Sequence, residues 1–112
     1  MKLYGLKNCD TCRRALKALK AAGHEVELVD VRNGGIPPEE LERLFMVFGQ
    51  DLVNRRSTTW RKLTDDERGG KSVALMLAHP SLMKRPVIIE EGGLLTLGWG
   101  KDEKKHWGIK DA

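Results

Sequence analysis

The sequence lacks the features of a membrane-spanning, secreted or repetitive protein. Its 112 residues contain no apolar run long enough to span a bilayer, no charged-then-apolar leader, no internal repeat and no low-complexity tract. The two cysteines are too few for the disulfide framework of a small secreted protein. We therefore expect a cytoplasmic protein, without membrane contact, that folds as one domain around one core.

Aromatic residues and surplus charge are also scarce. Aromatic side chains make up 5% of the chain, and 20 basic residues against 16 acidic ones leave a formal net charge of +4. Nucleic-acid binders usually concentrate basic residues on one surface, and RNA binders add aromatic side chains that stack on bases. Neither pattern is present, so we expect no nucleic-acid partner, while the charge balance permits an anionic ligand.

The first third of the chain has the pattern of a strand, a helix and a second strand. Residues 2–6 partly alternate in hydropathy, as a short strand does. Beyond Asn8 the apolar residues recur at helical spacing, and Gly23 stands where a helix commonly ends. Residues 25–30 then predict a second strand, parallel to the first.

The rest of the chain divides into a helical segment and a return to strands. Residues 37–80 are mostly helical in pattern, with Pro37 near one helix start and a capping box at residues 64–67. Gly92-Gly93 separates two apolar runs as in a β-hairpin, and a closing helix follows at 102–109.

The predicted fold class is therefore α/β. We expect a thioredoxin-like mixed β-sheet, built as βαβ followed by ββα, with an inserted helical subdomain. In this division residues 1–36 and 81–112 form the core and residues 37–80 the insertion, within one domain of residues 1–112.

The motif Cys9-Asp10-Thr11-Cys12 lies where the first strand passes into the first helix. Unpaired backbone N–H groups and the positive end of the helix dipole favour a thiolate at that place. The thiolate is the nucleophilic form of cysteine, so the motif predicts thiol chemistry at neutral pH. We expect Cys9 to be the more exposed sulfur, with Cys12 either a resolving thiol or a structural residue.

A zinc site is the main alternative use of a CxxC pair. Structural zinc usually takes four protein ligands. The chain has no second CxxC and no paired histidines, since His24, His79 and His106 are scattered. We therefore expect no metal.

At this point the sequence resembles a known family. Four segments carry a resemblance to the arsenate reductase (ArsC)-like family, which also contains the Spx regulators. The resemblance is greatest to the small YffB-type members and covers essentially the whole chain. The segments are Tyr4–Thr11, Arg56–Leu63, Leu75–Pro80 and Lys84–Pro86.

The resemblance implies a set of site residues. Cys9 would be the nucleophile, and Pro86 would be a cis proline close to the cysteine loop. Arg85 and Arg56 match arginines with which the family's reductases hold an oxyanion, and Arg55 is an adjacent candidate for the position of Arg56. A guanidinium suits this task because its forked N–H donors grip an oxyanion or a carboxylate. Asn8, beside Cys9 in the same motif, is assigned with them to substrate binding.

The chain departs from the reductases at two positions. No arginine follows Arg85, so Lys101 is the nearest cation to the family's third arginine, and a lysine lacks the bidentate fork. Cys12 occupies a position where the reductases commonly lack cysteine and rely on glutathione, whereas Spx regulators carry a CxxC there as a redox switch. Trp60 and Trp99 either line an apolar groove beside the thiol or complete a small core.

The main functional hypothesis is a glutathione-linked thiol–disulfide oxidoreductase that uses the Cys9 thiolate. Its partners would be glutathione as co-substrate, a small oxidised or oxyanion substrate, and glutaredoxin or another thiol as reductant. No bound cofactor is expected, and the chain is expected to be a monomer. The alternatives are a glutathione-dependent arsenate reductase and an Spx-like switch that binds a protein partner. The basic residues Arg13, Arg14, Lys17 and Lys20 either dock an acidic partner or form a solvated helix face.

Overall fold

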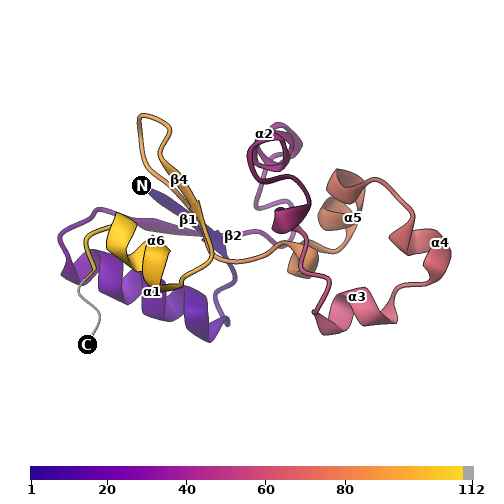
Figure 1. Ribbon diagram of the computed structural model, residues 1–112, viewed down its shortest axis with the longest axis horizontal. Coiled ribbons are helices and arrows are strands. Elements are labelled where there is room, and N and C mark those ends of the chain that lie inside the picture. Colours follow the sequence, from indigo (N-terminus) through magenta and orange to yellow (C-terminus); the bar gives the residue numbers. More distant parts are fainter. Residues whose placement is uncertain (110–112) are drawn as a thin grey trace. The chain divides into compact units, whose positions relative to one another are not determined.

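A four-stranded mixed sheet forms the basis of the first of two structural units (Figure 1). In the computed structural model, which describes residues 1–109, the strand order is β2-β1-β3-β4. The strands are β1 (Lys2–Gly5), β2 (Glu27–Asp30), β3 (Val87–Ile89) and β4 (Leu95–Leu97). β1 pairs with β2 in parallel and with β3 antiparallel, and β4 pairs antiparallel with β3. The predicted βαβ unit followed by ββα is thereby confirmed.

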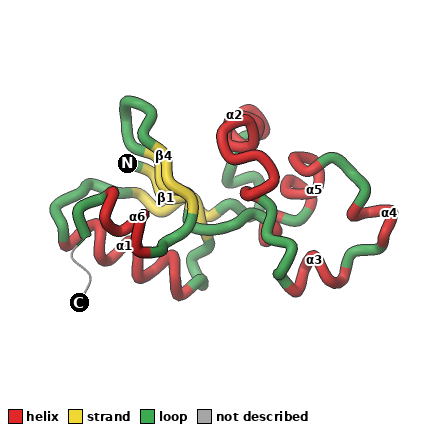
Figure 2. The backbone as a smooth tube through the Cα atoms, viewed as in Figure 1, coloured by secondary structure: helices red, strands yellow, loops and turns green. Residues whose placement is uncertain are grey.

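Two helices, α1 (Asp10–Ala21) and α6 (Lys101–His106), pack against this sheet (Figures 1 and 2). The buried cluster between them joins Leu3 of β1 and Ile88 of β3 to the inner face of α1. Trp107 directly follows α6 and closes this cluster, with its indole Nε1 donating to Thr96 Oγ1 at 2.8 Å. The buried members are Leu3, Cys12, Ala15, Leu19, Ile88 and Trp107.

The amphipathic pattern of α1 explains both its helical form and its orientation. Cys12, Ala15 and Leu19 are buried and recur three and four residues apart, which places them in one stripe along a helix. The basic residues lie on the other face, where Arg13 makes an exposed ion pair with Asp10 at 3.2 Å. Their exposure agrees with the solvated-face interpretation; the residues are Arg13, Arg14, Lys17 and Lys20.

The second unit, residues 32–84, is helical. It contains α2 (Pro38–Phe48), α3 (Thr58–Lys62), α4 (Asp65–Arg68) and α5 (Ser72–Ala78), with 3-10 turns at Gly49–Leu52 and Pro80–Leu82. α2 packs against α5. The unit has buried side chains of its own, which include Leu41, Leu44, Leu52, Met76 and Leu82.

The first unit consists of residues 1–31 and 85–112, and of these the structure describes all but 110–112. The predicted boundaries after residues 36 and 80 lie a few residues from these limits. The part of the predicted core at residues 110–112 falls outside the described residues. Among residues 1–109, no helix is both long enough and apolar enough to cross a membrane.

Candidate active site

The cysteine motif lies in the loop that joins the end of β1 to the start of α1. A tight turn shapes this loop, in which the Cys9 amide donates to the Leu6 carbonyl at 3.1 Å. Cys9 is the N-cap residue of α1, and its carbonyl accepts the Arg13 amide at 3.0 Å. The loop is also tied to β2, because the Lys7 amide donates to Asp30 Oδ2 at 3.1 Å. Asp30 is a supporting residue that the sequence analysis missed; an acidic residue at the end of a strand was the available signal.

The Cys9 sulfur is half-buried and biased toward the thiolate. Partial burial alone would raise the pKa of this thiol, but three neighbours outweigh it and hold the pKa below its usual value. The first is the backbone N–H of Cys12, which favours the thiolate without completing a regular N-cap hydrogen bond. The others are the Cys12 thiol and the Arg85 guanidinium, both as hydrogen-bond donors. Arg85 adds the attraction of its positive charge.

Cys12 has the opposite character although it lies only one helical turn away. Its side chain is fully buried in the core of the first unit, and burial raises the pKa of its thiol to about 11. The Leu6 backbone N–H is the largest effect that opposes this rise, while the neighbouring Cys9 sulfur contributes to the rise through a hydrogen bond and through its charge. The prediction that Cys9 is the more exposed of the two is confirmed.

The sheet register brings a second segment to the same edge as Cys9. Tyr4 near the end of β1 pairs with Val87, so Arg85 and Pro86 fall beside the start of the cysteine loop. The Arg85–Pro86 peptide bond is cis, as the resemblance implies. The hairpin returns to this edge, because the Gly98 amide donates to the Pro86 carbonyl at 2.8 Å. Lys101, the cation nearest to the third arginine position, is the first residue of α6.

The remaining predicted site residues lie in different places. Asn8 is exposed in the cysteine loop beside Cys9. Arg56 belongs to the helical unit, where it lines a cavity of about 610 Å³ together with Arg55 and Lys84. Three cations against the single carboxylate of Asp51 make this cavity basic. The part of Arg56 in the chemistry of Cys9 stays a prediction.

The tryptophans differ in their surroundings. Trp99 is half-buried against the core cluster of the first unit, as the core interpretation expects. The Trp60 ring in the helical unit has the guanidinium groups of Arg55 and Arg68 over it, at 5.4 and 5.7 Å from its centroid. The Trp60 ring is therefore a partner for cations.

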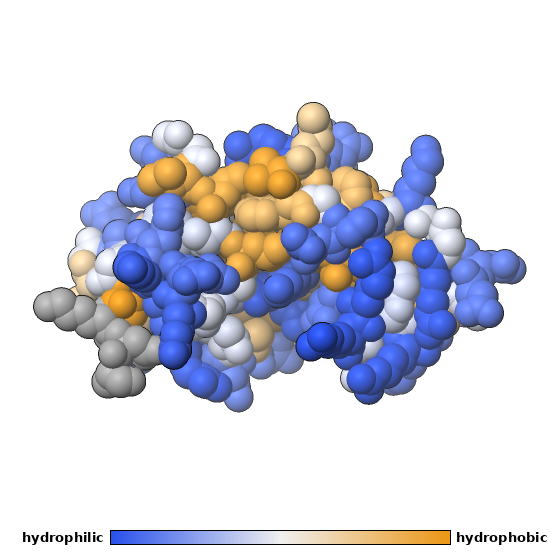
Figure 3. Space-filling model, in the orientation of Figure 1, coloured by the Kyte–Doolittle hydropathy of each residue, from blue (hydrophilic) through white to orange (hydrophobic). Residues whose placement is uncertain are grey.

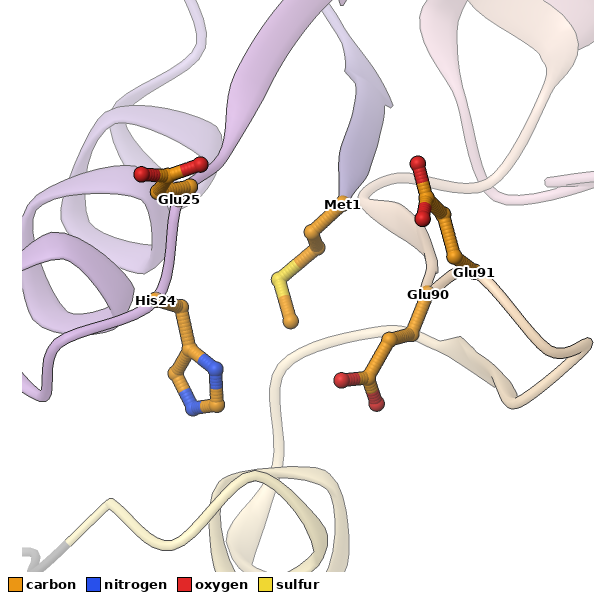
Figure 4. A pocket seen from close by; sticks show the side chains of 5 residues that line it. All are labelled: Met1, His24, Glu25, Glu90 and Glu91. Atoms are coloured by element: carbon orange, nitrogen blue, oxygen red, sulfur yellow. The ribbon is translucent and has the colours of Figure 1, made fainter.

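A further cavity, of about 430 Å³, lies at the opposite end of β1 from the cysteine loop (Figure 4). Met1 extends between His24 and Glu90, and Glu25 and Glu91 complete the lining. His24 is engaged there, because its Nε2 lies 2.9 Å from the Trp107 carbonyl oxygen. Within residues 1–109 no three side chains of His, Cys, Asp or Glu gather as a metal site would require. This acidic cavity contains no nucleophile, so the cysteine loop is the candidate active site.

Comparison with known proteins agrees with the fold and identifies the family. The family model described as ArsC family matches residues 4–106. A solved structure named YffB protein superposes with a TM-score of 0.81 at 35% identity, covering 94% of this chain and 96% of that one.

Two curated relatives cover nearly the whole chain. An uncharacterized protein of Haemophilus influenzae is 41% identical over 93% of both chains. The global transcriptional regulator Spx of Bacillus subtilis is 28% identical over 94% of this chain and 84% of its own. The matched residues, the mixed sheet and the cysteine loop together show that this chain belongs to the ArsC family and has its thioredoxin-like fold.

Proposed function

We propose that this protein is a glutathione-linked thiol–disulfide oxidoreductase with Cys9 as its nucleophile. The observation that carries the proposal is the Cys9 sulfur itself. It belongs to the N-cap residue of α1, is partly accessible, and has a pKa held below its usual value by Cys12 and Arg85 against the effect of burial. A stabilised thiolate at a helix N-terminus is the group that attacks disulfides and other electrophilic sulfur.

The reaction at Cys9 consists of two thiol–disulfide exchanges. The Cys9 thiolate attacks one sulfur of the substrate disulfide, so that a mixed disulfide forms on Cys9 and the other substrate sulfur leaves as a thiolate. A second thiol then attacks this mixed disulfide and regenerates the Cys9 thiolate. When glutathione is this second thiol, it becomes joined to the retained half of the substrate, and a further exchange with a second glutathione releases that half as a thiolate. Two glutathione molecules thus supply the two electrons and end as glutathione disulfide. Before the reaction, Arg85 donates a hydrogen bond to the Cys9 sulfur and so favours its thiolate, which is the attacking form.

The arginines suit the anionic groups of the partner. Glutathione carries carboxylates, and guanidinium groups bind carboxylates through paired N–H donors. We assign the binding of the partner's carboxylates to Arg85 and Arg56. Asn8, which lies beside the thiol, is assigned to substrate binding with them. Support for Arg56 comes from its exposed position in the basic cavity of the helical unit.

The test is turnover of a small disulfide by reduced glutathione. Cys9→Ser should abolish exchange, because a hydroxyl is not ionised at neutral pH. Arg56→Ala should raise the KM for glutathione with a smaller effect on kcat. Arg61→Ala is the matched control, because Arg61 is equally exposed in the same unit and has no assigned contact with substrate. Equal turnover by the wild type and Cys9→Ser would refute the proposal.

Arsenate as substrate is tested separately. Arsenate reduction would use the same thiolate but requires a tight grip on a small oxyanion. The chain offers Lys101 where the reductases of this family have a third arginine, so we expect little arsenate-dependent oxidation of glutathione. If turnover with arsenate were as fast as with a disulfide, the protein would instead be assigned as a glutathione-dependent arsenate reductase.

A further inference from the structure

The surroundings of Cys12 fit a fixed thiol. The side chain lies in the core cluster with no exposed surface. Gly5 on β1 leaves room for it, because a Cβ atom at Gly5 would stand 2.5 Å from the Cys12 sulfur. The Leu6 backbone N–H hydrogen-bonds to the same sulfur. The glycine, the amide and the helix therefore hold the sulfur in one place.

The hydrogen bond between the two sulfurs is assigned with Cys9 as acceptor, because the Cys12 backbone N–H and the Arg85 guanidinium also face the Cys9 sulfur and can only donate. It lowers the pKa of Cys9 and raises the pKa of Cys12. Both effects follow if Cys12 is the donor and the Cys9 thiolate the acceptor, since such a bond stabilises the charged form of one residue and the neutral form of the other. Cys12 thus acts on Cys9 as a buried donor, as the backbone N–H and Arg85 also do.

We propose that Cys12 is a positioning residue: its buried side chain stays a thiol and donates a hydrogen bond to the Cys9 thiolate, and an external thiol releases the mixed disulfide. The inference rests on the proposed function and deepens it by assigning the second exchange to glutathione. Of the two roles that the sequence leaves open for Cys12, resolving thiol and structural residue, it excludes the first, and it also excludes an internal disulfide switch.

The chemistry of exchange supports this assignment. A resolving cysteine must attack as a thiolate. Burial is the largest cause of the raised Cys12 pKa, and it still opposes ionisation of Cys12 after Cys9 has entered the mixed disulfide. A free thiol in water, with a pKa near 8.5, is by contrast ionised to a few per cent at neutral pH. Attack by Cys12 would also give up its hydrogen bond from Leu6 and its place beside Gly5. Glutathione meets neither obstacle.

A chromogenic aromatic disulfide tests the proposal on the wild-type chain without glutathione. Attack by Cys9 forms a mixed disulfide and releases one coloured thiolate. If Cys12 then attacked, a Cys9–Cys12 disulfide would form, the Cys12 proton would pass to solvent, and a second coloured thiolate would leave. We expect a single equivalent per chain, with the aromatic group retained on Cys9 by mass spectrometry. Rapid release of a second equivalent would overturn the proposal.

A pair of variants tests the hydrogen bond itself. The readout is the pH midpoint of Cys9 alkylation, followed by peptide mass spectrometry. Cys12→Ala removes the donor and should move the midpoint to higher pH, whereas Cys12→Ser retains an O–H donor and should restore it toward the wild-type value. An unchanged midpoint in Cys12→Ala, or equal shifts in both variants, would overturn the proposal.

The outcomes separate this inference from the proposed function. The alkylation midpoint and the release of coloured thiolate depend on Cys9 and Cys12 alone and require no glutathione. If glutathione turnover were absent while both results came out as expected, the proposed co-substrate would be wrong and the role of Cys12 would stand. Since the stoichiometry uses the wild-type chain, it gives an answer even where a variant fails to fold.

Discussion

At the scale of single residues, the site depends on two identical side chains in unlike surroundings. Cys9 caps a helix and faces Arg85, so its ionised form is favoured. Cys12 lies one turn further, in the apolar stripe of α1, so its neutral form is favoured. The CxxC spacing therefore places a partly exposed sulfur with a lowered pKa one helical turn from a buried sulfur with a raised pKa.

Arg85 offers the clearest prediction at this scale. Arg85→Ala removes a hydrogen bond and a positive charge from the Cys9 sulfur, so the pKa of Cys9 should rise and the pH midpoint of its alkylation should move upward. Arg85→Lys keeps the charge and should move the midpoint less. Arg14→Ala is a suitable control, because Arg14 is an exposed cation on the solvated face of α1. A midpoint that is the same in Arg85→Ala and wild type would contradict the role of Arg85.

The lowered pKa of Cys9 also links stability to pH. Because the folded state holds this pKa below that of the unfolded chain, ionisation of Cys9 stabilises the fold. The contribution is complete above the pKa of the unfolded thiol and is lost as the pH falls through the folded pKa. The free energy of unfolding should be measured for wild type and for Cys9→Ser from above the pKa of the unfolded thiol down through the folded pKa. Cys9→Ser should lack the loss of stability that the protonation of Cys9 causes in wild type.

At the scale of elements, short helices of the second unit depend on side-chain caps. Thr64 and Glu67 form a reciprocal capping box at α4, with bonds of 2.9 and 3.1 Å. The Thr64 backbone N–H and hydroxyl together lower the pKa of the Glu67 carboxyl. This element was predicted from its four-residue pattern. The helix α3 was not, although Ser57 accepts the Trp60 amide there as an ordinary N-cap, because no apolar periodicity marks it.

Thr64→Ala tests the capping box. Loss of a threonine N-cap costs about 0.5–2 kcal/mol of stability near neutral pH. The pKa of Glu67 should rise toward its usual value, which NMR titration of its carboxyl measures. The stability difference from wild type should shrink as the pH falls through the folded pKa of Glu67, since the protonated carboxyl no longer accepts well. Thr58→Ala, at an exposed position that is not a cap, should change stability by less than about 0.5 kcal/mol.

At the scale of the whole molecule, each unit has buried residues of its own and different surface chemistry. Leu3 anchors the sheet unit through contacts with α1 and β3. In the helical unit Met46 and Val47 of α2 are largely exposed at 86% and 56%, and Figure 3 shows apolar surface over that helix. Apolar side chains in this protein thus differ sharply in how much stability they supply.

Leu3→Ala and Leu94→Ala test this difference. Leu3 is fully buried, so its truncation should lower the free energy of unfolding by about 2–5 kcal/mol. Leu94, in the β3–β4 turn, is 53% exposed, so its truncation to alanine should lower the free energy of unfolding by less than about 0.5 kcal/mol. Denaturant unfolding followed by circular dichroism measures both. Comparable losses in the two variants would contradict the assignment of Leu3 to the core.

Local pattern alone determined much of this protein. The period of the apolar residues predicted α1, α2 and α5, and Gly92-Gly93 predicted the hairpin. The place of Cys9 before a helix predicted a thiol with a lowered pKa. Each of these features depends on neighbours within one or two turns. Only the tertiary structure decided the rest. The pairing of β1 with β3 brings Arg85 to Cys9, the tie from Asp30 secures the loop, and burial against Gly5 separates the pKa of Cys12 from that of Cys9. These are contacts between residues far apart in the chain or effects of exclusion from water, and neither can be read from spacing.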